Sequence, residues 1–99
     1  PLNTMTTTET KARLEAQAHD QLDLRGWTIE DGMWALQLER ETPVHGNETL
    51  IVEAYPTATD TEYTFLAREG GHHIETGDAP TIDEILEQIQ VYLHDHPQQ

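Results

Sequence analysis

Histidines and carboxylates are the residue types in this sequence that offer acid–base or metal-binding chemistry. His72 and His73 are adjacent, and His94 and His96 flank an aspartate near the end of the chain. Adjacent strand residues point to opposite faces of a sheet, and helix residues two apart lie about 200° around the axis. Neither pair is spaced to hold one ion, and neither brings the third and fourth ligands of a stable site. We predict surface histidines and no metal site.

Carboxylates gather near the C-terminus, at Asp83, Glu84 and Glu87. On a helix, Asp83 and Glu87 lie one turn apart, on the side away from the apolar stripe described below. Glu84 falls in the first turn, where the helix dipole favours a negative charge. We interpret the three as a solvated helix face rather than as an acid–base pair.

Several kinds of catalytic chemistry are excluded by composition. The chain contains no Cys and no Ser, and Lys11 is its single lysine. These absences remove thiolate sites, serine nucleophiles and a well-placed Schiff-base lysine. Neither glycine-rich phosphate-binding motif is present. We therefore predict no catalytic or cofactor-binding residues, and an enzyme based on histidine and carboxylate chemistry is a minor alternative.

The charge balance is strongly acidic: 19 Asp and Glu stand against 5 Lys and Arg, a formal net charge of −14. This composition resembles that of proteins from salt-in extreme halophiles, which implies an archaeal, cytoplasmic protein. Such an excess repels itself in dilute buffer and is tolerated where molar salt shortens the Debye length to about 3 Å. The alternative interpretation is a surface that mimics nucleic acid or attracts cations or basic proteins.

Nucleic acids and membranes are not expected as direct partners. The element order derived below is similar to that of the double-stranded-RNA-binding domain, but such domains bind through a basic helix and loop. Here the last helix is acidic, and the four arginines are scattered. No apolar run approaches the roughly 20 residues of a membrane span, and we expect no signal segment.

The N-terminal part of the chain predicts a tail and one helix. Residues 1–6 have no periodicity and are expected to form a loose tail, followed by a single domain over 7–96. A capping box at Thr6 and Glu9 precedes a stretch of helix formers over 7–23. The helix has a narrow apolar stripe and is followed by Gly26, which can end it; the stripe residues are Leu14, Ala18 and Leu22.

A β-hairpin is predicted next, from two apolar segments around Asp31-Gly32, a strong turn signal. A two-residue turn pairs Ile29 with Trp34 and Trp27 with Leu36. This register puts both tryptophans on the face that the helices should cover.

The remaining strands and the last helix follow in order. Strands are predicted over 50–55 and 61–69, and Gly70-Gly71 turns the chain into a short fifth strand with His73 opposite Arg68 and Ile74 opposite Ala67. A second capping box at Thr81 opens a helix that ends at Pro97, and its apolar stripe is Ile82, Ile85, Leu86, Ile89 and Leu93.

Together these elements predict an α+β two-layer sandwich of order α-β-β-β-β(-β)-α: an antiparallel meander sheet with both helices on one face. The other face then receives five apolar residues: Met33, Ala35, Ile51, Tyr55 and Leu66. Exposed apolar patches mark interaction sites. We therefore predict a non-catalytic protein-interaction module that forms a homodimer through this face. The alternatives are that polar neighbours break the patch into isolated residues, or that the protein binds a small ligand or cation between the helices and the Trp27/Trp34 region.

Overall fold

The computed structural model describes residues 7–42 and 46–97. All the strands belong to one sheet of order β1-β2-β3-β4-β5, in which every neighbouring pair is antiparallel. In chain order the elements are α1 (Thr7–Gln21), β1 (Thr28–Ile29), β2 (Leu36–Thr42), β3 (Gly46–Pro56), β4 (Thr61–Glu69), β5 (His72–Ala79) and α2 (Ile82–Asp95). The predicted α+β meander, with its fifth strand, is confirmed.

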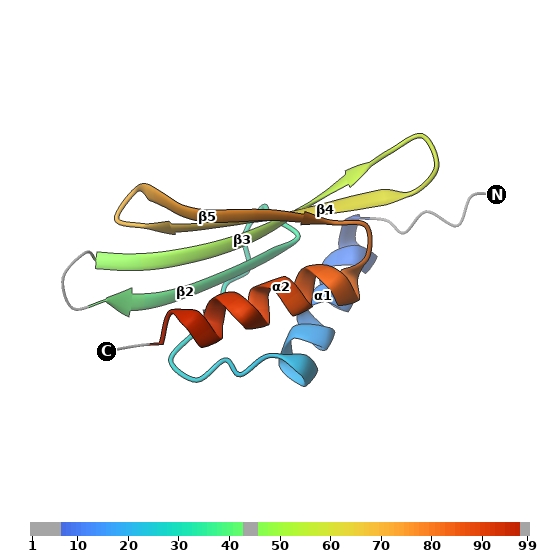
Figure 1. The fold of residues 1–99 in the computed structure, drawn as a ribbon. Coiled ribbons are helices and arrows are strands. Elements are labelled where there is room, and N and C mark those ends of the chain that lie inside the picture. The colour runs from blue at the N-terminus through green and yellow to red at the C-terminus, as the bar shows by residue number, and fades with distance from the viewer. Residues whose placement is uncertain (1–6, 43–45, 98–99) are drawn as a thin grey trace.

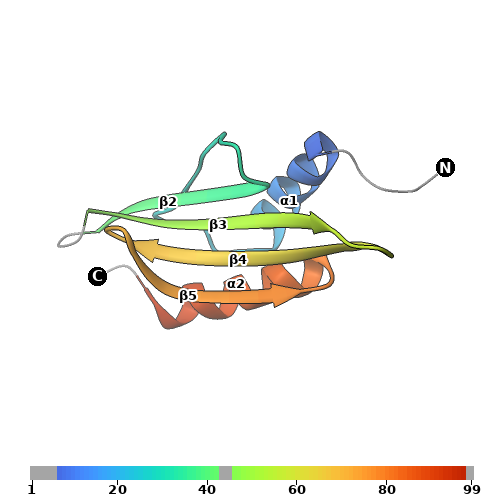
Figure 2. The same ribbon diagram turned by 90° about the horizontal axis from the view of Figure 1, so that it is seen from above.

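The molecule has two layers, with both helices beneath the same face of the sheet (Figure 1). Helix α2 lies under β4 and β5, whereas α1 lies under β2 and beside α2. The core between the layers is made from one side of each central strand together with the stripes of both helices. Figure 2 looks onto the opposite face, which neither helix covers.

Helix α2 follows its sequence signals closely. The Thr81 hydroxyl accepts a hydrogen bond from the Glu84 backbone N–H at 3.2 Å, which satisfies one of the donors left unpaired at a helix start. All five residues of the predicted stripe are buried, and so is Tyr92. The helix is therefore fixed both by its cap and by its apolar face.

Helix α1 is confirmed as well, although it ends two residues earlier than the predicted limit of 23. Leu14, Ala18 and Leu22 are buried in the core. Gly26 has φ 86°, a conformation that glycine adopts without strain, and lies in the turn leading toward β1. The predicted loose tail over 1–6, including Thr6 of the capping box, lies outside the described residues.

The first hairpin forms, but its predicted two-residue turn is wrong. Ile29 pairs with Leu38 rather than with Trp34, so residues 30–35 form a longer connection. Lys11 of α1 holds this connection: its Nζ lies 2.6 Å from Asp31 Oδ1 and 2.6 Å from the Gly32 carbonyl oxygen. Trp34 consequently lies outside the core, while Trp27 packs against it as predicted.

The β4–β5 hairpin is confirmed at its turn and differs beyond it. His73 pairs with Arg68 as predicted, and Gly70 and Gly71 adopt the positive φ angles of 57° and 90° that the turn needs. A bulge follows, so Ala67 pairs with Glu75 instead of Ile74. The predicted core position of Ile74 is therefore wrong, and its side chain is 37% exposed.

Candidate functional site

The open face of the sheet is the surface turned away from both helices (Figure 2). Strand alternation assigns its residues: Leu50 and Val52 of β3 enter the core, so Ile51 and Glu53 point to the other side. The pairings between strands extend this assignment across the sheet. The central part of the open face consists of Gln37, Glu39, Thr49, Ile51, Glu53, Thr64, Leu66, Arg68, Thr76 and Asp78.

An apolar pair lies at the centre of the open face. Ile51 of β3 pairs directly with Leu66 of β4, and the polar residues Gln37 and Thr76 complete this row on the outer strands. Ile51 is only 7% exposed although no helix covers it, and Leu66 is half-buried. This central row is the most apolar part of the open face.

Trp34 helps to form a hollow beside the central row. The hollow has a volume of about 280 Å³ and is lined by Trp34, Gln37, Asn47, Thr49, Ile51, Arg68 and Gly71. None of these residues is acidic, which is unusual in a chain of net charge −14. Arg68 is exposed and forms no ion pair with any residue of 7–42 or 46–97. The hollow is therefore a cationic spot on an otherwise acidic protein.

Carboxylates occupy the other side of the central row. Thr64 pairs with Glu53 on β3 and with Asp78 on β5, so the three form a second row across the sheet. The Asp78 carboxylate lies 3.3 Å from the Thr64 hydroxyl, and Glu53 accepts a short hydrogen bond from the Tyr55 hydroxyl. That bond to Glu53 raises the pKa of Tyr55. The open face thus has Arg68 on one side of the apolar pair, in a row that also contains Glu39, and Glu53 and Asp78 on the other side.

The structure distributes the five predicted interface residues differently from the prediction. Ile51 and Leu66 lie at the centre of the open face, and Tyr55 lies further along β3, 46% exposed. Ala35 is not on this face, because it is buried in the core cluster. Met33 is 85% exposed and belongs to the 30–35 connection rather than to a strand. Both differences follow from the longer connection in the first hairpin.

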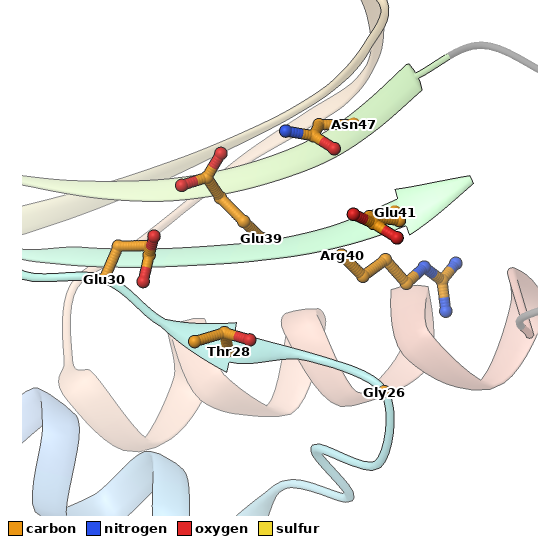
Figure 3. A pocket seen from close by; sticks show the side chains of 7 residues that line it. All are labelled: Gly26, Thr28, Glu30, Glu39, Arg40, Glu41 and Asn47. Atoms are coloured by element: carbon orange, nitrogen blue, oxygen red, sulfur yellow. The ribbon is translucent and has the colours of Figure 1, made fainter.

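A second hollow, of about 380 Å³, lies at the edge of the sheet beside β1 and β2. Figure 3 shows Glu39 and Glu41 turned toward the open side, whereas Arg40 between them points toward α2. Glu30, Thr28, Gly26 and Asn47 complete the lining. No group of His, Asp and Glu side chains in residues 7–42 and 46–97 is arranged to hold a metal ion, these glutamates included.

Sequence reasoning missed a buried polar cluster between the sheet and α2. Arg40 Nε donates to Glu48 Oε1 at 2.7 Å, and the Tyr92 hydroxyl donates to the other Glu48 oxygen. Arg40 Nη2 also donates to the His96 carbonyl oxygen at 2.5 Å, so the cluster ties the end of α2 to β2 and β3. Burial, followed by the hydrogen bond to Glu48, raises the pKa of Tyr92. Arg40 and Glu48 fall at core-facing positions of β2 and β3, but Glu48 precedes the predicted strand over 50–55, because β3 begins earlier, at Gly46.

In the part of the chain that the structure describes, the two tryptophans line different hollows. Trp27 lies under the Arg40 guanidinium, whose central carbon is 4.5 Å from the ring centroid. A hollow of about 360 Å³ beside it is lined by Asp23, Arg25, Gly26, Trp27, Arg40, Leu93 and Pro97. Trp34 lines the hollow on the open face instead. The predicted joint Trp27/Trp34 region is therefore wrong, because of the longer first hairpin.

Comparisons with protein-family models, curated proteins and solved structures found no match for this chain. Among residues 7–42 and 46–97, neither helix has the length and apolar character needed to cross a bilayer.

Proposed function

We propose that this protein is a non-catalytic interaction module that associates with a second copy of itself through the open face. The observation that carries the proposal is the polarised arrangement of that face: an apolar pair, Ile51 and Leu66, between an arginine and a set of carboxylates. A small domain with one uncovered sheet face commonly covers it with a partner.

Two features favour contact over simple exposure to water. Trp34 and Leu66 are only half-buried, so a partner could remove further apolar surface from water. The apolar row separates Arg68 from Glu53 and Asp78, and Glu39 is the carboxylate of the central open face that shares a row with Arg68. Two copies can therefore place opposite charges together, which neither copy achieves alone.

The high negative charge agrees with a cytoplasm of molar salt, as in a salt-in archaeal halophile. Two chains of formal charge −14 repel each other in dilute buffer. At about 1 M salt the Debye length is near 3 Å, and this long-range repulsion is screened while apolar contacts persist. We expect self-association to require molar KCl.

The test is the solution mass, measured by light scattering after size exclusion in molar KCl. The wild-type chain should give twice the monomer mass of 11.3 kDa. Ile51→Glu and Leu66→Glu should give the monomer mass with unchanged far-ultraviolet circular dichroism. Val91→Glu is the matched control, because Val91 is 55% exposed on α2, on the other layer. A wild-type monomer, or folded open-face variants that remain dimers, would overturn the proposal.

A second candidate function is the binding of a small anionic ligand beside Trp27, where two guanidinium groups and an aromatic ring line one hollow. This candidate is the weaker one, because Arg25 is paired with Asp23 and Arg40 with Glu48. Native mass spectrometry of the purified protein tests it. A retained anion that is lost in Trp27→Ala would favour ligand binding over self-association.

A further inference from the structure

We propose that the two copies pack with their strands antiparallel, so that Glu53 of each copy enters the hollow between Trp34 and Arg68 of the other. This inference rests on the self-association proposed above and names its orientation and its specific contacts.

The spacing of the charged residues along the strands supports this orientation. On β4, Arg68 lies two residues after Leu66 and Thr64 lies two residues before Leu66. Arg68 and Thr64 are therefore each about 7 Å from the central row. Thr64 stands between Glu53 and Asp78 in its row. The cationic and the acidic positions are therefore equidistant from the apolar pair, on opposite sides of it.

Only one of the two simple face-to-face arrangements matches these charges. Sheets that pack face to face keep their strands within about 30° of each other. If a two-fold axis relates the two copies, it therefore runs either parallel to the strands or parallel to the central row. With the axis parallel to the strands, Arg68 of one copy lies near Arg68 of the other copy. Glu53 of each copy then lies near the acidic row of the other. An axis along the central row stacks Ile51 and Leu66 on their own equivalents. It also places Arg68 over Thr64, flanked by Glu53 and Asp78.

The hollow suits a carboxylate side chain. Its lining combines the Arg68 guanidinium, which forms no ion pair within residues 7–42 and 46–97, with the amides of Gln37 and Asn47. None of the lining residues named above is acidic. Glu39 is the carboxylate in the Arg68 row, separated from Arg68 by Thr49, and its oxygen lies 3.4 Å from the Gln37 amide nitrogen. The rotation about the central row brings Glu53 of the second copy over Thr49, between Arg68 on β4 and Glu39 on β2. The Glu53 carboxylate is already turned to the open side and accepts from the exposed Tyr55.

Charge reversal tests the contact. Arg68→Glu and Glu53→Arg should each weaken dimerisation by about tenfold or more, and the double variant should recover most of that loss, as for close charge pairs across interfaces. Dissociation constants are measured by sedimentation at about 1 and 3 M KCl, where the dimer is expected to form. Arg25→Glu and Glu87→Arg are the matched controls, because they change the net charge equally on exposed side chains away from the open face.

Introduced cysteines provide an independent measurement, because the natural chain contains none. Arg68→Cys mixed with Glu53→Cys should be joined between copies by a short bis-maleimide cross-linker, because packed sheets lie about 10 Å apart, too far for a direct disulfide. Glu62→Cys should not pair with itself, because the proposed axis separates the two Glu62 positions by about 27 Å along the strands. The other axis brings them together.

These outcomes separate the orientation from the function. The orientation is wrong and the open-face interface stands if Leu66→Glu dissociates the dimer but the reversed charges fail to compensate. The same holds if the cross-linker joins two copies of Glu62→Cys. If Leu66→Glu leaves a folded dimer, both proposals fail.

Discussion

Arg40 and Glu48 form an ion pair that is almost fully buried between the sheet and α2, with side-chain exposures of 7% and 3%. The pair is not isolated: Tyr92 donates to Glu48, and Arg40 stacks on Trp27 and donates to the last turn of α2. Within residues 7–42 and 46–97, every buried side-chain nitrogen and oxygen has a hydrogen-bond partner. A buried ion pair whose charges are fully hydrogen-bonded costs the folded state little free energy. A single buried charge that has lost its partner is strongly destabilising.

Glu48→Ala should therefore be strongly destabilising, because it leaves the Arg40 guanidinium buried without its carboxylate. We expect a loss of about 3–5 kcal/mol in the free energy of unfolding, measured with urea in molar KCl. The double variant Arg40→Met with Glu48→Leu should be much closer to wild type. Arg25→Ala removes an exposed ion pair and should change the free energy of unfolding little. If Glu48→Ala and Arg25→Ala lose similar amounts of stability, burial has no special role.

Stability should fall at alkaline pH through Tyr92. Its pKa is raised in the folded state above the ordinary value of 10.0, so the folded protein keeps the phenol proton that the unfolded chain releases. The stability that Tyr92 contributes in this way is complete below pH 10 and is lost as the pH rises further. The free energy of unfolding then falls by up to about 1.4 kcal/mol per pH unit. Tyr92→Phe should flatten this decline in urea titrations at successive pH values above 10. The pKa of the exposed Tyr55 is also raised, by its hydrogen bond to Glu53, but solvent screens that interaction, so Tyr55→Phe should flatten the decline less. An unchanged slope in Tyr92→Phe would show that other groups cause the decline.

Gly77→Ala should destabilise the protein, because α2 and β4 leave no space for a methyl group at that position. The added Cβ would lie 2.6 Å from a Phe65 ring carbon and would also collide with the Gln88 side chain. Overpacking of this kind costs about 1–3 kcal/mol. Gly32→Ala is the control, since its Cβ meets only the flexible end of Gln37. Equal stability of the two variants, measured by thermal melting, would argue against a close approach at Gly77.

The melting temperature should rise steeply with added KCl. Screening reduces the self-repulsion of a chain with formal charge −14, and the effect should be largest at low concentrations, where the Debye length changes most. Potassium sulfate at equal ionic strength separates screening from apolar strengthening, because sulfate adds the second effect. A melting temperature indifferent to KCl would contradict the proposed adaptation to salt.

Most of the fold could be predicted because local signals and apolar periodicity agree. The second helix has a cap, a continuous stripe and a proline after its end, and its stripe is buried throughout. The face of β2 was also predicted correctly although its register was not. The pairing shifted by an even number of residues, which leaves Leu36 and Leu38 on the core side.

The features of the fold that could not be predicted depend on contacts between residues that are distant in the sequence. Asp31-Gly32 is a strong local turn signal, but Lys11 binds both residues from another element and stabilises a longer connection. The bulge beside Ile74 has no marker in the sequence. Arg40 and Glu48 alternate in phase with core leucines, but only their pairing across β2 and β3 explains how two charges can be buried.

The anchoring of the 30–35 connection by Lys11 has a practical consequence for labelling. The chain has a single lysine, so its only side-chain amine is already bound to Asp31 and to the Gly32 carbonyl oxygen. Acylation of that amine removes its charge and requires it to leave both partners. The rate of modification by an amine-reactive reagent, followed by peptide mass mapping, would therefore report how often the segment carrying Trp34 detaches from α1.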